Sequence, residues 1–241
     1  MSGELPEEIS SMRYIYCHPL FDERKCAHRF SYQLARAFNK MGLTLERFDY
    51  TGCGENQGEF SRISLNSLRN DLIRFLANDQ VTLIGLRFGA SLAWDFCLRR
   101  PNQVKKLILI APVLKGNEYI RHLLRKQKIK DLMTQNPPPK INAHPYCNLE
   151  GYKTSLNFIR DLEKFDLLAQ IKSAPGIRSV LFLHISPNAR MTNDLSSLRK
   201  TLLNHNDDLR FLNLPAGNFW ERIPTADYTT ITRMITNNCH E

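Results

Sequence analysis

The residues with the clearest chemical signal lie in a predicted strand-to-helix turn, where residues 83–90 read LIGLRFGA. Gly85 and Gly89 flank the central Arg87 with one residue between each pair. A sharp turn of this kind favours glycine, because its backbone is strained and neighbouring side chains would collide. The guanidinium of Arg87 is permanently protonated, so it is not a nucleophile.

Two roles for Arg87 follow from this position. The start of a helix presents unpaired N–H groups and a positive dipole end, so Arg87 would strengthen a site for a carboxylate, phosphate or sulfate. Alternatively, Asp22 or Glu23 pairs with Arg87 and closes the pocket. The two hypotheses differ in whether a pocket stays open beside the turn.

The elements that must position this turn alternate along the chain, which predicts a mostly parallel α/β sheet of about six strands with helices on both faces. Apolar runs predict strands at residues 14–17, 43–48, 81–84, 107–110, 179–185 and 209–214. Helical spacing of apolar residues predicts helices near residues 30–41, 65–75, 88–99, 195–202 and 231–235.

Between residues 115 and 176 this alternation stops. A basic helix, three consecutive prolines at 137–139, a loop through Pro145 and a helix from about Tyr152 to Phe165 are expected there. We interpret residues 115–176 as a lid inserted into a single domain that spans residues 1–241.

Composition narrows the class of protein. The 241 residues are 42% hydrophobic, and no apolar run reaches the roughly 20 residues of a membrane-spanning helix. An acidic N-terminus and six singly spaced cysteines favour a cytoplasmic protein with free thiols and without a metal or other cofactor. The net charge of +9 is concentrated at residues 121–130. We interpret that stretch as a solvated helix face, with nucleic acid or anionic lipid as the alternative.

Three motifs and a terminal pair together resemble a known family. Residues 18–24 read HPLFDER, residues 48–54 read FDYTGCG, residues 85–89 read GLRFG, and Phe219-Trp220 follows the last predicted strand. The chain resembles the α/β-hydrolase superfamily over nearly its whole length. It is most similar to the second type of exosortase A system-associated hydrolases, which are found beside bacterial exopolysaccharide genes.

This resemblance implies a Ser-His-Asp triad, and the sequence departs from it in three places. Arg87 stands where the nucleophilic serine is expected. The loop for the acid reads SPNAR from Ser186, with Asp194 further on, and the loop for the base reads PAGNFW from Pro215 without a histidine. We therefore predict a non-catalytic or anion-binding member linked to exopolysaccharide or exosortase metabolism.

An enzyme remains the alternative prediction: an ester or thioester hydrolase with Cys53 as nucleophile and His18 as base. A third hypothesis is a binding module for a small anionic, acyl or sugar ligand; no oligomeric state is predicted. The expected ligand-binding residues share the carboxyl edge of the sheet, where open α/β sheets bind ligands. They are Arg87, Phe88, His18, Glu23, Asn218 and Trp220. His184 is expected to be a buried strand residue, and Asp49 an acceptor for loop amides.

Overall fold

The structure, a computed structural model, describes residues 12–134, 145–172, 179–188, 190–205, 208–222 and 227–239. The three prolines at 137–139, which figured in the sequence analysis, lie outside these ranges. The chain divides into two compact units. Unit 1 comprises residues 1–48, 78–112 and 171–241, and unit 2 comprises residues 49–77 and 113–170.

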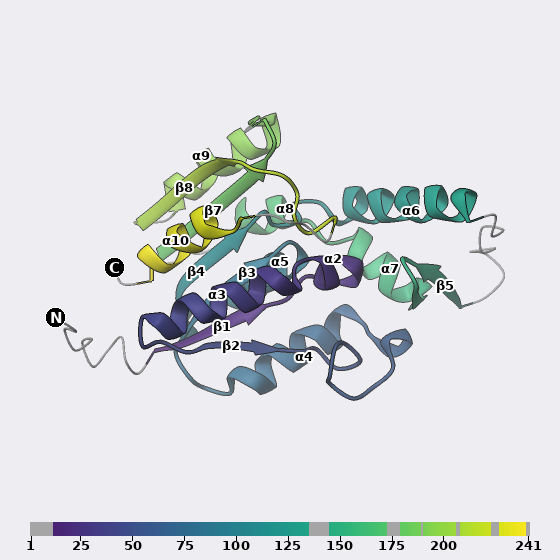
Figure 1. Cartoon of the computed structure of the whole chain (residues 1–241), viewed down its shortest axis with the longest axis horizontal. Coiled ribbons are helices and arrows are strands. Elements are labelled where there is room, and N and C mark those ends of the chain that lie inside the picture. Colours follow the sequence, from purple (N-terminus) through teal and green to yellow (C-terminus); the bar gives the residue numbers. More distant parts are fainter. Residues whose placement is uncertain are drawn as a thin grey trace. The chain divides into compact units, whose positions relative to one another are not determined.

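Unit 1 contains a six-stranded sheet in the order β2-β1-β3-β4-β7-β8, in which every neighbouring pair is parallel (Figure 1). The predicted sheet is thus confirmed. The strands are β1 (Arg13–Cys17), β2 (Leu45–Phe48), β3 (Val81–Leu86), β4 (Val104–Ile110), β7 (Ser179–Ser186) and β8 (Asp208–Pro215). The helices of unit 1 are α2 (Phe21–Cys26), α3 (His28–Lys40), α5 (Phe88–Arg99), α9 (Asn193–His205) and α10 (Thr229–Asn237), and α8 (Leu167–Lys172) crosses the boundary between the units.

The strand order fixes where a ligand site is expected. From β1 the chain moves to β2 at one edge, and from β3 it moves through β4 toward the opposite edge. The order therefore reverses between β1 and β3, and the carboxyl ends of these strands meet there. Such a switch point is the usual place for ligands in open α/β sheets.

The core of unit 1 is built on both faces of the sheet. On one face, alternate strand residues such as Tyr14, Tyr16 and Ile84 form a buried cluster with apolar residues of α3 and α10. Helix α5 is almost wholly buried and contacts β1, β3 and β4, but none of its residues belongs to that cluster. Helix α5 therefore packs on the opposite face.

Unit 2 contains α4 (Leu65–Leu76), α6 (Gly116–Met133), the hairpin strands β5 (Tyr146–Leu149) and β6 (Tyr152–Ser155), and α7 (Leu156–Glu163). The prediction of a helix from about Tyr152 was wrong, since Tyr152–Ser155 pairs with β5 and the helix starts only at Leu156. Ser155 caps that helix by accepting a hydrogen bond from the backbone N–H of Phe158. The single domain with a lid over residues 115–176 stays a prediction.

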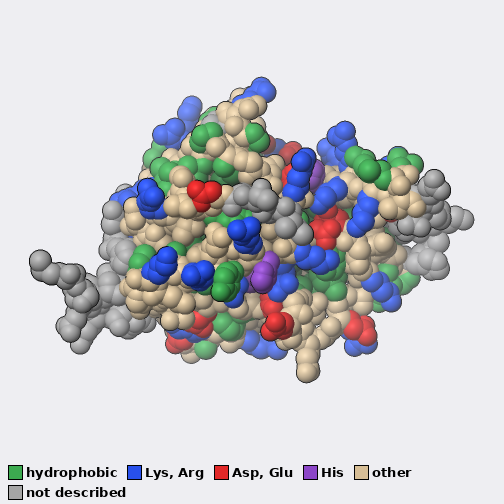
Figure 2. Space-filling view, in the orientation of Figure 1, with side chains coloured by type: hydrophobic (Ala, Val, Ile, Leu, Met, Phe, Trp, Pro, Cys, Tyr) green, Lys and Arg blue, Asp and Glu red, His purple; other side chains and the backbone are tan. Residues whose placement is uncertain are grey.

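The basic segment lies on α6, and most of its cationic side chains are exposed. Leu123 and Gln127 form part of the buried side of the helix. Figure 2 shows Lys and Arg side chains spread over the visible face of the molecule. Across the described ranges, no helix is both long and apolar enough to cross a membrane.

Candidate functional site

The turn between β3 and α5 has the geometry that its glycines predicted. A Cβ atom on Gly85 would lie 2.3 Å from the Cα of Ala90. A Cβ atom on Gly89 would lie 2.2 Å from the carbonyl oxygen of Cys17 and 2.4 Å from that of His18. Both approaches are shorter than any side chain tolerates, so the glycines allow the start of α5 to press against the end of β1.

Arg87 occupies a strained backbone conformation at the tip of this turn, with φ 55° and ψ −123°. Such a conformation costs a non-glycine residue roughly 1–3 kcal/mol, and strain of this kind is concentrated at functional sites. The surrounding backbone holds it in place. The Arg87 N–H donates to the carbonyl of Ile110, and its carbonyl accepts from the N–H groups of Ala90 and Ser91.

The side chain of Arg87 contacts Glu23, Ala111 and Trp220 of unit 1. Its Nε donates to Oε1 of Glu23 at 3.0 Å, and its Nη1 donates to the carbonyl of Ala111 at 3.0 Å. Its guanidinium carbon lies 5.0 Å from the ring centroid of Trp220. These contacts bring together the ends of β1, β3, β4 and β8 at one edge of the sheet.

Burial determines what this arrangement does electrostatically. The Glu23 side chain is 3% exposed and that of Arg87 is 19% exposed. A carboxylate removed from water requires an opposite charge or hydrogen-bond donors, and Arg87 supplies both. Asp22, the other predicted partner, instead accepts from Lys25 at 3.2 Å. The structure therefore pairs Arg87 with Glu23.

Sequence reasoning did not identify Ala111 at this edge, and it named Phe21 only as part of the motif at residues 18–24. Ala111 follows β4 directly and has φ 43°, and Phe21 begins α2 with φ 54°. With Arg87, they place three strained residues near the carboxyl ends of neighbouring strands. The only sequence signal for Ala111 is its position directly after an apolar strand, because the side chains of Ala111 and Phe21 carry no polar or ionisable group.

The other predicted site residues of unit 1 are placed as follows. His18 follows β1, is buried, and packs edge-on against Tyr16 with ring centroids 4.8 Å apart. Phe88 is buried as the first residue of α5. Trp220 is also buried, and its indole nitrogen has no hydrogen-bond partner among the described residues. A ligand-binding role for these residues stays a prediction.

The loops predicted to hold an acid and a base carry asparagines. Asn188 is exposed in the turn after β7, and Asp194 lies in the first turn of α9. Asn218 follows β8 and donates from Nδ2 to Oε1 of Glu221 at 3.0 Å. His184 in β7 is half-buried rather than buried, and its Nε2 lies 3.2 Å from the carbonyl oxygen of Arg190. Desolvation lowers the pKa of His184.

Cys53 belongs to unit 2 and is buried in a tight loop. Its backbone N–H donates to the carbonyl of Tyr50, and its carbonyl accepts from the N–H of Asn56. Asp49 accepts a hydrogen bond from the N–H of Glu55 in the same loop, which confirms its expected role as an acceptor for loop amides.

Comparisons with known proteins agree with this fold. Mitochondrial palmitoyl-protein thioesterase ABHD10 from Mus musculus is 26% identical over 134 residues, which cover 53% of this chain and 43% of that protein. The match thus spans less than half of the relative's length. The solved structure of mouse alpha/beta hydrolase domain-containing protein 10 aligns with a TM-score of 0.55 at 18% identity, covering 93% of this chain and 88% of that one.

A second solved structure, Est1E from Butyrivibrio proteoclasticus with ferulic acid bound, aligns with a TM-score of 0.67 at 14% identity, covering 98% of this chain and 91% of that one. At such identities these structures establish the α/β-hydrolase fold alone. A family model described as serine aminopeptidase, S33 matches residues 25–170. The chain therefore belongs to the serine aminopeptidase S33 family of the α/β-hydrolase superfamily.

Proposed function

We propose that this chain is a non-hydrolytic member of its family, in which Arg87 replaces the nucleophilic serine and the Arg87–Glu23 pair fills the space beside it. The observation that carries this proposal is the buried ion pair at the tip of the strained turn. The turn is the place where this superfamily lifts its nucleophile above the sheet. A guanidinium there cannot attack an acyl carbon.

The loops after β7 and β8 support the same proposal. Hydrolysis of an ester needs a base to activate the nucleophile and an acid to orient that base. The residues after β8 include Asn218 but no histidine before the start of α10. An amide neither accepts a proton at neutral pH nor stabilises an imidazolium by its charge.

We propose the cytoplasm as the compartment and exopolysaccharide or exosortase-linked metabolism as the setting. The motifs at residues 18–24, 48–54 and 85–89 support this part through the resemblance to exosortase A system-associated hydrolases. A non-hydrolytic protein in that setting would act by binding, with a small anionic, acyl or sugar ligand as its partner.

One observation favours an anion-binding version of this proposal. The indole N–H of Trp220 is buried beside the Arg87 guanidinium and has no acceptor among the described residues. A buried donor of this kind usually finds a partner, and a ligand oxygen would supply one. In that version a ligand anion competes with Glu23 for Arg87.

Hydrolase assays test the proposal directly. The substrates are p-nitrophenyl acetate, a feruloyl ester and an S-palmitoyl peptide, the last two chosen from the ligand and the activity named for the similar proteins. We expect no turnover above that of the heat-denatured protein and no labelling by a fluorophosphonate probe. Turnover that is lost in Cys53→Ala or His18→Gln would overturn the proposal in favour of the alternative hydrolase.

The variant Arg87→Ser sharpens this test. A serine at the turn restores the missing hydroxyl, but no base stands ready to activate it, so we expect the variant to stay inactive. The matched variant Arg87→Lys keeps the positive charge and controls for loss of the folded state, which circular dichroism monitors. Robust esterase activity of Arg87→Ser would show that a competent base exists and would contradict the proposed loss of the triad.

A further inference from the structure

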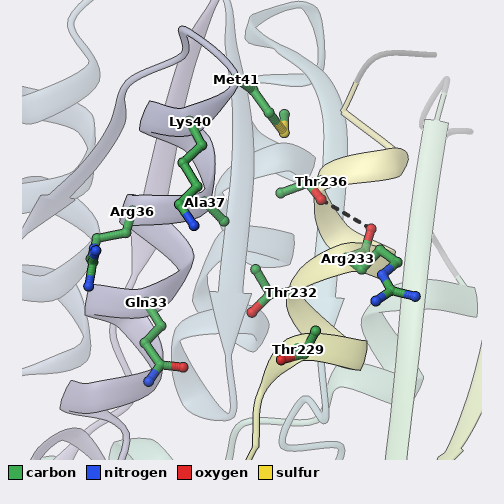
Figure 3. Close-up of a pocket in the computed structure, with 9 residues that line it drawn as sticks. All are labelled: Gln33, Arg36, Ala37, Lys40, Met41, Thr229, Thr232, Arg233 and Thr236. Carbon is green, nitrogen blue, oxygen red and sulfur yellow. Dashed lines mark hydrogen bonds between the residues drawn. The ribbon is translucent and has the colours of Figure 1, made fainter.

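A groove between α3 and α10 lies in unit 1 and takes no part in the proposed function. Its volume is about 420 Å³. Its lining includes Arg36, Ala37 and Lys40 of α3, Met41 directly after α3, and Thr232 and Arg233 of α10 (Figure 3). Helices α3 and α10 contact each other, so one packed pair of elements forms both walls.

The groove is strongly cationic. Arg36 and Lys40 lie one turn apart on α3, and Arg233 lies on α10. All three side chains are exposed, and none forms an ion pair with a carboxylate of the described residues. The lining residues include no Asp or Glu. Three cations around one groove without a carboxylate in its lining favour an anionic occupant.

An acidic group close to Arg233 is already engaged by Thr229. Asp227 accepts hydrogen bonds from the N–H and the hydroxyl of Thr229, and these bonds lower its pKa. Arg233 also lowers the pKa of Asp227 through its charge, although the two form no ion pair. Asp227 therefore leaves most of the positive charge of the groove uncompensated.

Thr232 supplies a second, independent observation. Its hydroxyl oxygen is buried and has no hydrogen-bond partner among the described residues. The hydroxyl of Thr236, by contrast, donates to the carbonyl of Arg233, and that of Thr229 donates to Asp227. Figure 3 shows Thr232 on the side of α10 that faces α3. An unsatisfied buried hydroxyl is costly, and an oxygen of a ligand would accept from it.

The other lining residues indicate which chemical groups the ligand carries. Ala37 and Met41 give the α3 wall an apolar surface between the polar groups. Arg36 and Arg233 extend away from the gap in Figure 3, and because both are exposed, a change of rotamer can turn either guanidinium toward it. Two guanidiniums, an ammonium and a hydroxyl are donors suited to phosphate oxygens.

We propose that this groove binds the phosphate monoester group of a ligand whose adjoining part is apolar. Lys40 and Thr232 contact the phosphate oxygens, Arg36 and Arg233 close over them, and Ala37 with Met41 contact the apolar part. A soluble phosphorylated metabolite and the headgroup of a lipid such as phosphatidic acid share this chemistry.

Isothermal titration calorimetry at low ionic strength tests the proposal with inorganic phosphate, phenyl phosphate and phenyl sulfate as probes. We expect phenyl phosphate to bind more tightly than inorganic phosphate, because its ring reaches the apolar wall. The double variant Arg36→Gln/Lys40→Gln should weaken phenyl phosphate binding by at least about tenfold, since charge-assisted hydrogen bonds are lost. Phenyl sulfate, with one negative charge fewer, should bind more weakly.

Two further variants separate a built site from general attraction to a basic protein. Thr232→Val removes one hydroxyl without changing charge, and we expect it to weaken phenyl phosphate binding by roughly fivefold. Lys200→Gln removes one charge from an exposed position of α9 and should leave the affinity unchanged. Equal weakening by Lys200→Gln and by Lys40→Gln, or no effect of Thr232→Val, would overturn the proposal.

Vesicle sedimentation distinguishes the two sources of phosphate. Vesicles of phosphatidylcholine with phosphatidic acid are compared with vesicles that hold an equal charge as phosphatidylglycerol, whose phosphate is a diester. Binding to the phosphatidic acid vesicles that Thr232→Val weakens assigns the groove to a lipid headgroup. Binding of phenyl phosphate without sedimentation of the protein assigns the groove to a soluble ligand. If the protein binds neither phenyl phosphate nor the phosphatidic acid vesicles, the proposed site is refuted.

Discussion

Unit 1 accommodates positive charge in two different ways. At the turn after β3, Arg87 is largely buried and its guanidinium is held by Glu23 and the carbonyl of Ala111. Along α3 and α10, Arg36, Lys40 and Arg233 are exposed and form no ion pair with a described carboxylate. The first arrangement is internally satisfied, whereas the second leaves donors available to a ligand.

The difference follows from desolvation. A charge inside a protein must be compensated by nearby groups, because water no longer does so. A charge at the surface stays solvated, so the fold does not have to supply a partner. The residue type alone therefore does not indicate a ligand site. The cation at the carboxyl edge of the sheet has a carboxylate partner within the fold, whereas the cations on α3 and α10 have none among the described carboxylates.

The largest effect is expected where the turn itself is broken. In Gly89→Ala the new Cβ would lie 2.2 Å from the backbone oxygen of Cys17, and neither backbone can move without disturbing β1 or α5. We expect a loss of more than about 4 kcal/mol in the free energy of unfolding, or no folded protein. Urea denaturation followed by circular dichroism measures it. Near-native stability would show that the turn is looser than described.

The next largest effect concerns the ion pair. Arg87→Ala leaves the buried Glu23 carboxylate without this cation, which should cost about 3 kcal/mol in the free energy of unfolding. The double variant Arg87→Met/Glu23→Leu removes both charges, and we expect it to recover much of that loss. A cost below about 1 kcal/mol for Arg87→Ala is the range of a surface ion pair. That result would show that Arg87 is a solvated cation like Arg36, Lys40 and Arg233.

Backbone strain at Arg87 can be separated from the charge. Arg87→Gly and Arg87→Ala remove the same ion pair, but only glycine relieves the positive φ of this position. We expect Arg87→Gly to be more stable than Arg87→Ala by about 1 kcal/mol. Equal unfolding midpoints for the two variants would contradict a strained turn.

A smaller effect is expected in the groove. Thr232→Val replaces a buried hydroxyl that has no described partner with a methyl group of similar size. The free energy of unfolding should stay unchanged or rise by up to about 1 kcal/mol. Thermal denaturation without ligand measures this change. A clear loss of stability would mean that the hydroxyl already has a role inside the protein and is not reserved for a ligand.

The smallest effect concerns the protonation of His184, which burial disfavours. Desolvation lowers the pKa of His184 below its ordinary 6.5. Below that pH the unfolded chain binds a proton more readily than the folded one, so the stability contributed by neutral His184 is present above pH 6.5 and is lost as the pH falls. In His184→Asn the free energy of unfolding should depend less steeply on pH between about 5 and 7. An unchanged pH profile would contradict this account.

Local patterns predicted much of the fold. The helix Phe88–Arg99 is found at its predicted bounds, since Gly89 permits its start and Pro101 follows its end. The hairpin at Tyr146–Ser155 was missed, because its two-residue turn, Glu150-Gly151, lacks the asparagine or aspartate that usually marks such turns. The apolar spacing after Tyr152 therefore led to a predicted helix that wrongly included the strand Tyr152–Ser155.

The sequence by itself determined the alternation of strands and helices, the sharp turn at Gly85 and Gly89, and the permanent charge of Arg87, because these depend on spacing and residue type. Only the tertiary structure decided that Glu23 rather than Asp22 pairs with Arg87, and that Thr232 faces a cationic groove. Glu23 and Arg87 are 64 positions apart, and their contact depends on how the ends of β1 and β3 come together. The spacing of neighbouring residues does not predict such long-range contacts, because they form only when the whole sheet packs and is buried.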